Sequence, residues 1–369
     1  MDRSSPEVLD LLGSWNGLGV VVRHDAPTGT WIFIALHDAT LGPPVGGCRL
    51  KVYESPAAAL RDAMRLAEGM THKWAAIDLP FGGGKSVLAV PRLLEGEERR
   101  GLFRRFGELL EGLNGAYGTG EDLGTTPQDM AYLAQVTEHV VGVSRGGPGH
   151  PADPGPFTAL GVLSGIRAAL AHRTGSDDLS GRRVAVQGVG DVGEPLARML
   201  ASEGATLLLS DLDPERARAV ADRLGASVVE ASDIYDVECD VFAPCAVGGV
   251  LDPSTIARLR CGIVAGSANN QLEDAGDAER LLERGILYAP DYVVNAGGAM
   301  AFGLSHQGAS EEGEVERRVS GLGDHLAEIF SEAAERGESP LAAARRRVER
   351  VLARGRKTTG FTPDVVVSG

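Results

Sequence analysis

The chain contains 369 residues, of which 43% are hydrophobic, and its formal net charge at pH 7 is −15. Its length predicts two domains, and its acidic surplus argues against nucleic acid or an anionic membrane as the main partner. The first residues lack the basic start and apolar run of a signal peptide, and no apolar stretch approaches the ~18 residues that a membrane span needs. We therefore expect a cytoplasmic protein.

The cysteines and histidines form no recognisable metal pattern. The eight histidines are scattered and make no H-E-x-x-H motif, which argues against zinc. The four cysteines have no C-x-x-C spacing, which favours reduced thiols over a disulfide or a metal site. These cysteines are Cys48, Cys239, Cys245 and Cys261.

The first part of the chain mixes strands and helices. Residues 31–37 are aromatic and β-branched between turn-forming residues, which predicts a strand. Residues 56–73 carry apolar side chains at helical spacing and predict a helix that leads directly into Lys73. A glycine-rich loop is expected at residues 82–84, immediately before Lys85.

A run rich in glycine and proline at residues 146–156 cannot continue a regular element and predicts a crossing between domains. Beyond it, short apolar strands alternate with helical stretches. The strands are expected at residues 184–187, 206–210, 240–243, 262–265 and 286–289. This alternation predicts an α/β fold whose second domain is a doubly wound parallel sheet.

The two expected domains share the chain unequally. Residues 1–147 are predicted to form an α/β domain for substrate binding and oligomerisation. Residues 148–324 are predicted to form a Rossmann-type domain. The charged, helical stretch near the end, at about residues 325–369, is expected to return to the first domain.

A glycine motif follows the strand at residues 184–187, and a helix is expected directly after it. Gly188 permits a tight turn, Gly190 lets the backbone approach a pyrophosphate, and Gly193 lets helix and strand pack closely. Asp211 closes the next strand, where its carboxylate can bind ribose hydroxyls and repel a 2′-phosphate, so NAD is favoured over NADP. A glycine turn without a cofactor is the alternative. The motif residues are Gly188, Val189, Gly190, Asp191, Val192 and Gly193.

Lysine is rare in this chain, which has 36 basic residues but only four lysines, among them Lys73 and Lys85. A desolvated lysine can lose its proton, whereas arginine stays charged, so a retained lysine points to a task that arginine cannot perform. Two ammonium groups in one cleft lower each other's pKa, which would let one act as a general base. Asp122, in a glycine-rich loop, can relay a proton or simply cap a turn.

Several segments in chain order resemble the leucine, phenylalanine and valine dehydrogenases of the glutamate dehydrogenase superfamily. They lie at residues 46–49, 70–73, 82–85, 120–125, 243–246, 266–272 and 288–298. The resemblance runs from about residue 15 to residue 355 and includes motifs from both domains. It implies a homo-oligomer, from dimer to octamer, with the reaction in a cleft between the domains.

The resemblance also implies a role for individual residues. Lys73 would bind the substrate α-carboxylate with help from the backbone of Gly46 and Gly47. Lys85 would activate water, and Asp122 would move protons to and from the α-amino group. Cofactor contacts are implied for Thr158, Cys245, Ala246, Asn269 and Asn295.

The implied reaction is the reversible, NAD-dependent oxidative deamination of an apolar L-amino acid to a 2-oxo acid and ammonia. Val45 and Phe302 stand where glutamate dehydrogenases carry polar partners for the side-chain carboxylate, so glutamate should be rejected. Gly120 and Ala299 replace larger residues of leucine dehydrogenases and would enlarge the pocket, whereas Phe302 would narrow it. The balance slightly favours phenylalanine or another bulky apolar amino acid, with leucine and branched-chain substrates close behind. Such size differences discriminate by only ~1–3 kcal/mol each.

Two other functional classes remain open at this stage. A non-catalytic NAD sensor on the same fold would need neither Lys85 nor Asp122. A hydroxy-acid dehydrogenase would normally use a histidine as its acid–base group, and no histidine here lies in a comparable motif.

Overall fold

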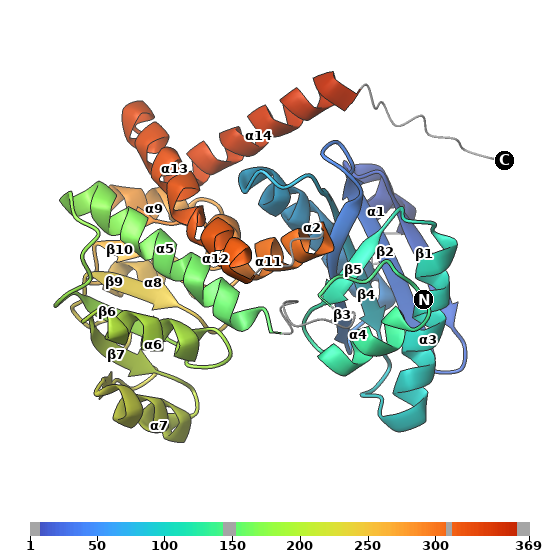
Figure 1. The fold of residues 1–369 in the computed structure, drawn as a ribbon, viewed down its shortest axis with the longest axis horizontal. Coiled ribbons are helices and arrows are strands. Elements are labelled where there is room, and N and C mark those ends of the chain that lie inside the picture. Colours follow the sequence, from blue (N-terminus) through green and yellow to red (C-terminus); the bar gives the residue numbers. More distant parts are fainter. Residues whose placement is uncertain (1–7, 143–152, 308–311, 360–369) are drawn as a thin grey trace. The chain divides into compact units, whose positions relative to one another are not determined.

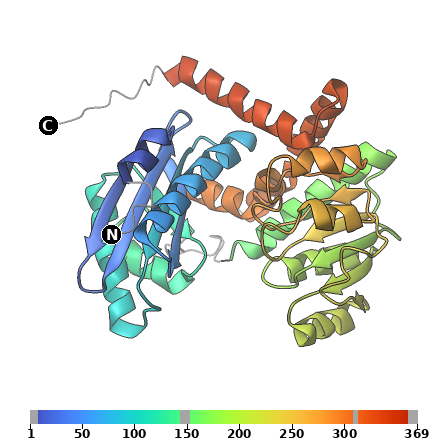
Figure 2. The same ribbon diagram turned by 180° about the vertical axis from the view of Figure 1, so that it is seen from behind.

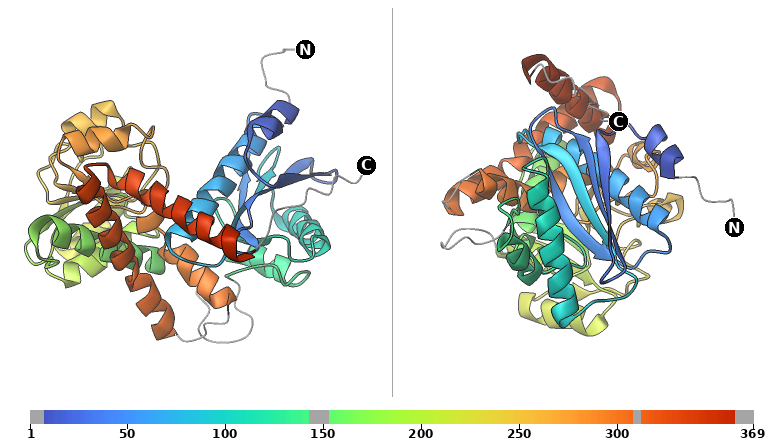
Figure 3. Two further views of the ribbon diagram at one scale, coloured as in Figure 1. Left: turned by 90° about the horizontal axis from the view of Figure 1, so that it is seen from above. Right: turned by 90° about the vertical axis from the view of Figure 1, so that its right-hand side faces the viewer.

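The computed structural model describes residues 8–142, 153–307 and 312–359. The chain divides into two compact units, Met1–Ala152 with Val348–Gly369, and Asp153–Arg347. Figure 1 labels their elements, and Figures 2 and 3 show the same ribbons from other sides. No helix among the described residues is long and apolar enough to cross a membrane.

The first unit is built on a five-stranded mixed sheet with the strand order β1-β2-β4-β3-β5. β3 pairs in parallel with both β4 and β5, whereas β2 runs antiparallel to β1 and β4. The strands are β1 (Gly19–Asp25), β2 (Thr30–Asp38), β3 (Pro44–Lys51), β4 (Gly82–Ala89) and β5 (Gly118–Glu121). Before residue 143, the helices of this unit are α1 (Val8–Ser14), α2 (Pro56–Ala76), α3 (Gly96–Gly112) and α4 (Pro127–Ala134).

Side chains alternate along each strand, so apolar residues reach both faces of this sheet. Helices pack against each face. Phe33 and Val87 pack against α2, whereas Ile32 and Leu88 belong to the core formed with α3 and α4. The Ser55 hydroxyl caps α2 by accepting a hydrogen bond from the backbone N–H of Ala58 at 3.1 Å. The predicted strand at 31–37 and helix at 56–73 are confirmed, the helix extending three residues beyond Lys73.

The second unit contains a six-stranded parallel sheet with the order β11-β10-β9-β6-β7-β8. Read from β8, this is the 3-2-1-4-5-6 order of dinucleotide-binding folds, with the switch point between β6 and β9. The strands are β6 (Arg183–Gln187), β7 (Thr206–Ser210), β8 (Ser227–Val228), β9 (Val241–Pro244), β10 (Ile263–Val264) and β11 (Leu287–Tyr288). All five predicted strands are present, although β10 and β11 are shorter than expected.

The helices of the second unit connect these strands and add a separate helical group. The connecting helices are α6 (Gly193–Ser202), α7 (Pro214–Leu224), α8 (Pro253–Arg258) and α9 (Asp277–Glu283), and α10 (Asp291–Val294) follows the last strand. The group around α5 (Gly155–Thr174) includes α11 (Gly297–His306), α12 (Glu312–Ser320) and α13 (Leu322–Arg336). Gly161 and Gly165 let α5 approach these helices, since an added Cβ would lie 2.9 Å from Leu322 and 2.8 Å from Leu326, respectively.

Two parts of the structure differ from the sequence expectations, and a third prediction falls largely outside the described residues. Most of the predicted crossing, residues 146–152, lies outside the described residues, and its end at Gly155 and Pro156 opens α5. The return of the chain to the first unit begins at Val348, inside α14 (Pro340–Thr359), and not near residue 325. Residues 82–84 form the start of β4 and not a loop.

Candidate active site

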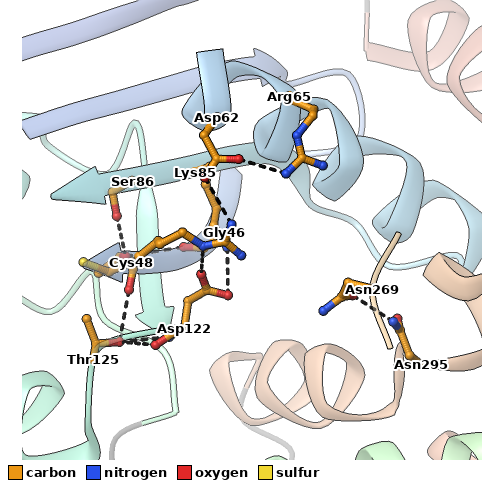
Figure 4. Close-up of polar contacts among 12 residues, drawn as sticks. Gly46, Cys48, Asp62, Arg65, Lys85, Ser86, Asp122, Thr125, Asn269 and Asn295 are labelled. Atoms are coloured by element: carbon orange, nitrogen blue, oxygen red, sulfur yellow. Dashed lines mark hydrogen bonds and ion pairs between the residues drawn. The ribbon is translucent and has the colours of Figure 1, made fainter. Parts of the chain in front are cut away.

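Two oppositely charged side chains meet beside β3. Lys85 lies in β4, and Asp122 directly follows β5, so the two residues come from the strands on either side of β3. Lys85 Nζ lies 3.1 Å from Asp122 Oδ1, and Lys85 is only 4% exposed. Figure 4 shows this pair. The structure therefore brings together the two residues that the sequence analysis singled out for proton transfer.

Gly47 leaves the space in which this pair forms. A Cβ atom at Gly47 would lie 2.8 Å from Asp122 Cβ and 3.4 Å from Lys85 Nζ. The first distance is below any ordinary carbon–carbon contact, so a larger residue would displace the carboxylate. The glycine at this position thus accommodates the protein's own charged groups.

Arg49 is a third charged residue of this site, and no role for it was predicted from the sequence. Its Nε donates to Asp122 Oδ2 at 2.8 Å, and its Nη1 donates to Asp62 Oδ2 at 3.1 Å. Arg49 and Gly47 are two residues apart on β3 and therefore face the same side of the sheet. The two-residue spacing from Gly47 indicates a shared face, but the sequence does not show that β3 lies between β4 and β5 and so brings Arg49 to Asp122.

The charges around Asp122 keep it ionised. Burial alone would raise the pKa of Asp122, but the positive charges of Lys85 and Arg49 and their hydrogen bonds lower that pKa to about 2. The backbone N–H of Asp122 also donates to Thr125 Oγ1 at 2.9 Å, which fixes the turn that follows β5. Asp122 is thus a carboxylate held at both its side chain and its backbone.

The triple glycine of β4 is surrounded by other parts of the protein. A Cβ on Gly83 would lie 1.9 Å from Thr71 Oγ1, and one on Gly84 would lie 2.7 Å from the Tyr117 ring. These glycines therefore let α2 and Tyr117 pack closely against β4. The last turn of α2 carries Lys73, so the helix that contacts Gly83 also presents the second lysine.

The carbonyl groups on the β3 side of the site are already bonded. Tyr117 OH donates to Gly46 O at 2.6 Å, and Trp74 Nε1 donates to Val45 O at 2.9 Å. Cys48 points to the opposite face, where it is fully buried in the core beside α3. Burial raises the pKa of the Cys48 thiol to about 12. Cys48 is thus a core residue, although its neighbours in sequence line the charged site.

In the second unit, the predicted glycine motif joins β6 to α6 as expected. Gly188 has a φ of +92°, and a Cβ on Gly193 would lie 1.9 Å from Gly188 O, so both positions require glycine. By contrast, a Cβ on Gly190 would meet no atom within 4 Å. The motif is therefore packed at its two ends and open at Gly190.

Asp211 directly follows β7 and is bonded to the glycine motif. Its Oδ2 accepts a hydrogen bond from the Val189 N–H at 2.9 Å, and its Oδ1 accepts one from the Asp213 N–H at 2.9 Å. Each carboxylate oxygen has further lone pairs, so these bonds orient Asp211 without exhausting its capacity to bind hydroxyl groups.

The other predicted cofactor residues lie on loops that follow neighbouring strands or at the start of α5. A Cβ on Gly188 would lie 2.8 Å from Ala246 Cβ, which places the loop after β9 against the glycine motif. Asn295 is buried and donates through Nδ2 to Asn269 Oδ1 at 2.8 Å (Figure 4). Thr158 Oγ1 donates to Pro154 O at 2.9 Å, and Cys245 is partly buried after β9.

The residues predicted to select the substrate are divided between the units. Val45 is buried and packs against Gly118 in the first unit, while Ala299 and Phe302 are half-buried on one face of α11 in the second. Gly120 was expected to enlarge the pocket. A Cβ at Gly120 would lie 2.7 Å from Val141 Cγ2, so Val141 fills the space that a larger residue would occupy.

Among the residues that the structure describes, no group of three or more His, Cys, Asp or Glu side chains could hold a metal ion. A dinucleotide, in contrast, fits the second unit. Open backbone at Gly190, the start of α6 and the oriented Asp211 carboxylate lie at the carboxyl ends of adjacent parallel strands, where such ligands bind.

Comparisons with known proteins agree with this architecture. A family model described as Glu/Leu/Phe/Val dehydrogenase, dimerisation domain, matches residues 25–139, and one described as Glutamate/Leucine/Phenylalanine/Valine dehydrogenase matches residues 208–355. A leucine dehydrogenase of Thermoactinomyces intermedius is 41% identical over 353 residues, which are 95% of each chain. A phenylalanine dehydrogenase of Caldalkalibacillus thermarum is 41% identical over 354 residues, which are 94% of each chain. The crystal structure of L-tryptophan dehydrogenase from Nostoc punctiforme has a TM-score of 0.81 and 38% identity, covering 95% of this chain and 100% of that one.

The fold and these similarities define an oxidoreductase that acts on CH–NH2 groups with a nicotinamide cofactor. More specifically, the chain belongs to the Glu/Leu/Phe/Val dehydrogenase family of amino acid dehydrogenases. It carries out NAD(P)-dependent oxidative deamination of an L-amino acid. The family, fold class and enzyme class expected from the sequence are thus confirmed.

Proposed function

We propose that the protein catalyses the NAD-dependent, reversible oxidative deamination of an apolar L-amino acid. The amino acid, NAD⁺ and water give a 2-oxo acid, ammonium, NADH and a proton. The buried pair of Lys85 and Asp122 carries this proposal because it offers an amine and a carboxylate at 3.1 Å, within proton-transfer distance. A protein that only senses NAD needs neither group.

The residues of the first unit would divide the work. Lys73 binds the substrate α-carboxylate, assisted by the backbone of Gly46 and Gly47. Lys85 takes a proton from the water that attacks the iminium carbon. Asp122, which is ionised, exchanges protons with the α-amino group and with Lys85. Lys85 must lose its proton during turnover, whereas Lys73 acts as a permanent cation.

Bound NAD would supply the hydride acceptor. Gly188, Gly190 and Gly193 would hold the pyrophosphate, together with the first N–H groups of α6. The negative charge of Asp211 would bind ribose hydroxyls and disfavour a 2′-phosphate. Arg216 Nη1 lies 3.9 Å from Asp211 Oδ1 and is the nearby cation that could favour NADP, so both cofactors must be compared.

The nicotinamide end is assigned to residues on the neighbouring loops. Thr158 and Asn295 would hold the nicotinamide, and Asn295 is restrained for this task by its bonds to Asn269 and to Ser267 O. Cys245 and Ala246 would line the cofactor beside the glycine motif.

We expect the enzyme to accept substrates whose side chain is apolar. Val45 and Phe302 offer no partner for a buried carboxylate, so glutamate would be rejected. Phenylalanine or another bulky apolar amino acid is slightly favoured, with leucine and branched-chain substrates close behind. The relatives described above include leucine, phenylalanine and tryptophan dehydrogenases, which supports this range.

The cellular setting and assembly complete the proposal. The four cysteines are free thiols, which is compatible with a reducing compartment such as the cytoplasm. A homo-oligomer, from dimer to octamer, is supported by the dimerisation-domain model that matches residues 25–139. Light scattering coupled to size-exclusion chromatography measures that assembly directly.

A substrate panel tests the proposed reaction. Apolar L-amino acids are compared by kcat/KM at alkaline pH with NAD and with NADP, and L-glutamate serves as the charged control. We expect NADH formation with phenylalanine or leucine and little with glutamate. Binding of NAD without oxidation of any amino acid would instead indicate a sensor on the same fold, and a preference for NADP would reject the role given to Asp211.

A further inference from the structure

Arg49 bridges two acidic side chains from different elements. Its Nε donates to Asp122 Oδ2 at 2.8 Å, and its Nη1 donates to Asp62 Oδ2 of α2 at 3.1 Å. All three side chains are at least three-quarters removed from solvent. Their charges therefore interact more strongly than surface ion pairs, and their geometry is more tightly fixed.

Asp62 is itself anchored from two further directions. Tyr53 OH donates to Asp62 Oδ2 at 2.7 Å, and Arg65 donates to Asp62 Oδ1 at 2.8 Å. Burial alone would raise the pKa of Asp62, but these donors and the charges of Arg49 and Arg65 lower it overall. Asp62 is thus an ionised and immobilised partner for the guanidinium of Arg49 (Figure 4 shows Asp62 and Arg65).

The two oxygens of Asp122 have different partners. Oδ1 faces the ammonium of Lys85, which can give up a proton, whereas Oδ2 faces the guanidinium of Arg49, which cannot. Rotation about the terminal bond of an aspartate side chain is soft, so a carboxylate without a second partner would not keep one oxygen toward Lys85. A planar guanidinium fixed at its other end can impose that orientation.

We propose that Arg49 is a positioning residue for proton transfer: anchored by Asp62, it occupies Asp122 Oδ2 and so keeps Asp122 Oδ1 directed at Lys85. This inference rests on the proposed function, in which Asp122 exchanges protons with the α-amino group and Lys85. It adds that the proton route runs through one oxygen of Asp122 and that α2 contributes to catalysis through Asp62.

A double-mutant cycle in the full-length enzyme tests the proposal. We expect Arg49→Met to lower kcat by about 100-fold, a loss typical of a misplaced catalytic group, while KM for the amino acid changes far less. Because Arg49 acts through Asp122, Arg49→Met in an Asp122→Asn background should cause little further loss. Arg49→Lys should restore part of kcat, since one ammonium cannot reproduce the bonds to both carboxylates.

Arg65→Met is the matched control. Arg65 contacts the other oxygen of Asp62, Oδ1, so its removal leaves the bonds of Asp62 Oδ2 to Arg49 and Tyr53 in place. The Arg65 side chain is also 52% exposed. This variant should keep kcat within about twofold of wild type, as expected for loss of a largely exposed ion pair. The proposal fails if Arg49→Met keeps near-normal kcat. It also fails if the fold-loss of kcat in the double variant equals the product of the losses in Arg49→Met and Asp122→Asn.

A second readout does not depend on turnover. The carboxyl carbon resonance of Asp122, assigned by its loss in Asp122→Asn, is titrated in ¹³C-aspartate-labelled protein. The groups that face Asp122 are Lys85, Arg49 and Thr125. Removing Arg49 should raise the titration midpoint of Asp122, and removing Arg65 should not. If wild type oxidises no amino acid, the proposed function fails, whereas an unchanged midpoint in Arg49→Met rejects the link between Arg49 and Asp122.

Discussion

Gly190 of the second unit differs from the glycines around the charged site of the first unit in what lies beside it. In the first unit, Gly47, Gly83 and Gly84 leave room for other parts of the same protein, namely Asp122, Thr71 and Tyr117. In the second unit, Gly190 leaves room that no described protein atom fills. A glycine-rich segment therefore indicates a close approach, but only the fold shows whether a ligand or the protein itself makes it.

The largest expected effect comes from removing the buried lysine of the first unit. Lys85→Ala should lower kcat by about 10³-fold or more, as expected for loss of a general base, while the affinity for NAD changes little. Lys85→Arg should be nearly as damaging, because a guanidinium does not release its proton. Stopped-flow or steady-state kinetics and NAD titration by fluorescence measure both properties.

Arg92→Ala serves as the control for the lysine variants, since Arg92 forms an exposed ion pair with Glu98 in the same unit. Near-normal turnover by Lys85→Ala would show that the base has been assigned wrongly. Loss of NAD binding in the same variant would show that the two units are not functionally separate.

A pair of glycine substitutions gives the next largest effect. Gly47→Ala would place a methyl group 2.8 Å from Asp122 Cβ, so it should lower kcat by about 100-fold through displacement of the carboxylate. Gly190→Ala meets no protein atom, so it should leave Tm unchanged and weaken NAD binding by about tenfold, or 1.4 kcal/mol. Calorimetry for Tm and titration for NAD affinity separate the two outcomes. Reversed results would remove the contrast between the units.

The charge of Asp122 predicts a pH-dependent contribution to stability. Its pKa is lowered from 3.8 to about 2 in the folded protein, so it stabilises the fold above pH 4 by about 2 kcal/mol. That contribution is lost as the pH falls from about 4 to 2, because the unfolded chain binds the proton first. The stability difference between wild type and Asp122→Asn should therefore be smaller by about 1 kcal/mol at pH 3 than at pH 7. A difference that stays constant between pH 7 and pH 3 would contradict the pairing.

The smallest expected effect concerns substrate choice. Phe302 lies on a half-buried face of α11, and Phe302→Ala should shift kcat/KM toward phenylalanine relative to leucine by about tenfold, within the ~1–3 kcal/mol that size differences supply. Ala301→Gly changes a buried neighbour on the same helix and is the control for loss of helix stability. An unchanged ratio would exclude Phe302 as a specificity residue.

The second unit could be predicted from the sequence more completely than the first. The strand, glycine motif, helix and Asp211 lie within about 30 residues of one another, and each follows from local chemistry. The site in the first unit depends on β3 lying between β4 and β5, which are separated from it in sequence. Arg49 could therefore not be assigned, and residues 82–84 were predicted to form a loop because three glycines contain no signal for a buried strand.

The residues proposed to select the substrate also could not be placed correctly without knowing which distant segments pair. Gly120 suggested a larger pocket because a missing methyl group was interpreted as empty space. The structure places Val141 there, since the segment after α4 pairs with β5 at Thr119 and Val140. Similarly, Cys48 directly follows Gly46 and Gly47 in sequence, but the alternation of side chains along β3 directs it to the opposite face.

The position of Ala299 and Phe302 on α11 has a practical consequence for altering this enzyme. Both side chains belong to the second unit, whereas Lys85, Asp122 and Arg49 are embedded in the sheet of the first. A mutant library confined to the half-buried face of α11 would therefore change residues proposed to contact the substrate side chain while leaving Lys85, Asp122 and Arg49 unaltered. If the proposed roles hold, part of the substrate range can be varied separately from the proton-transfer groups.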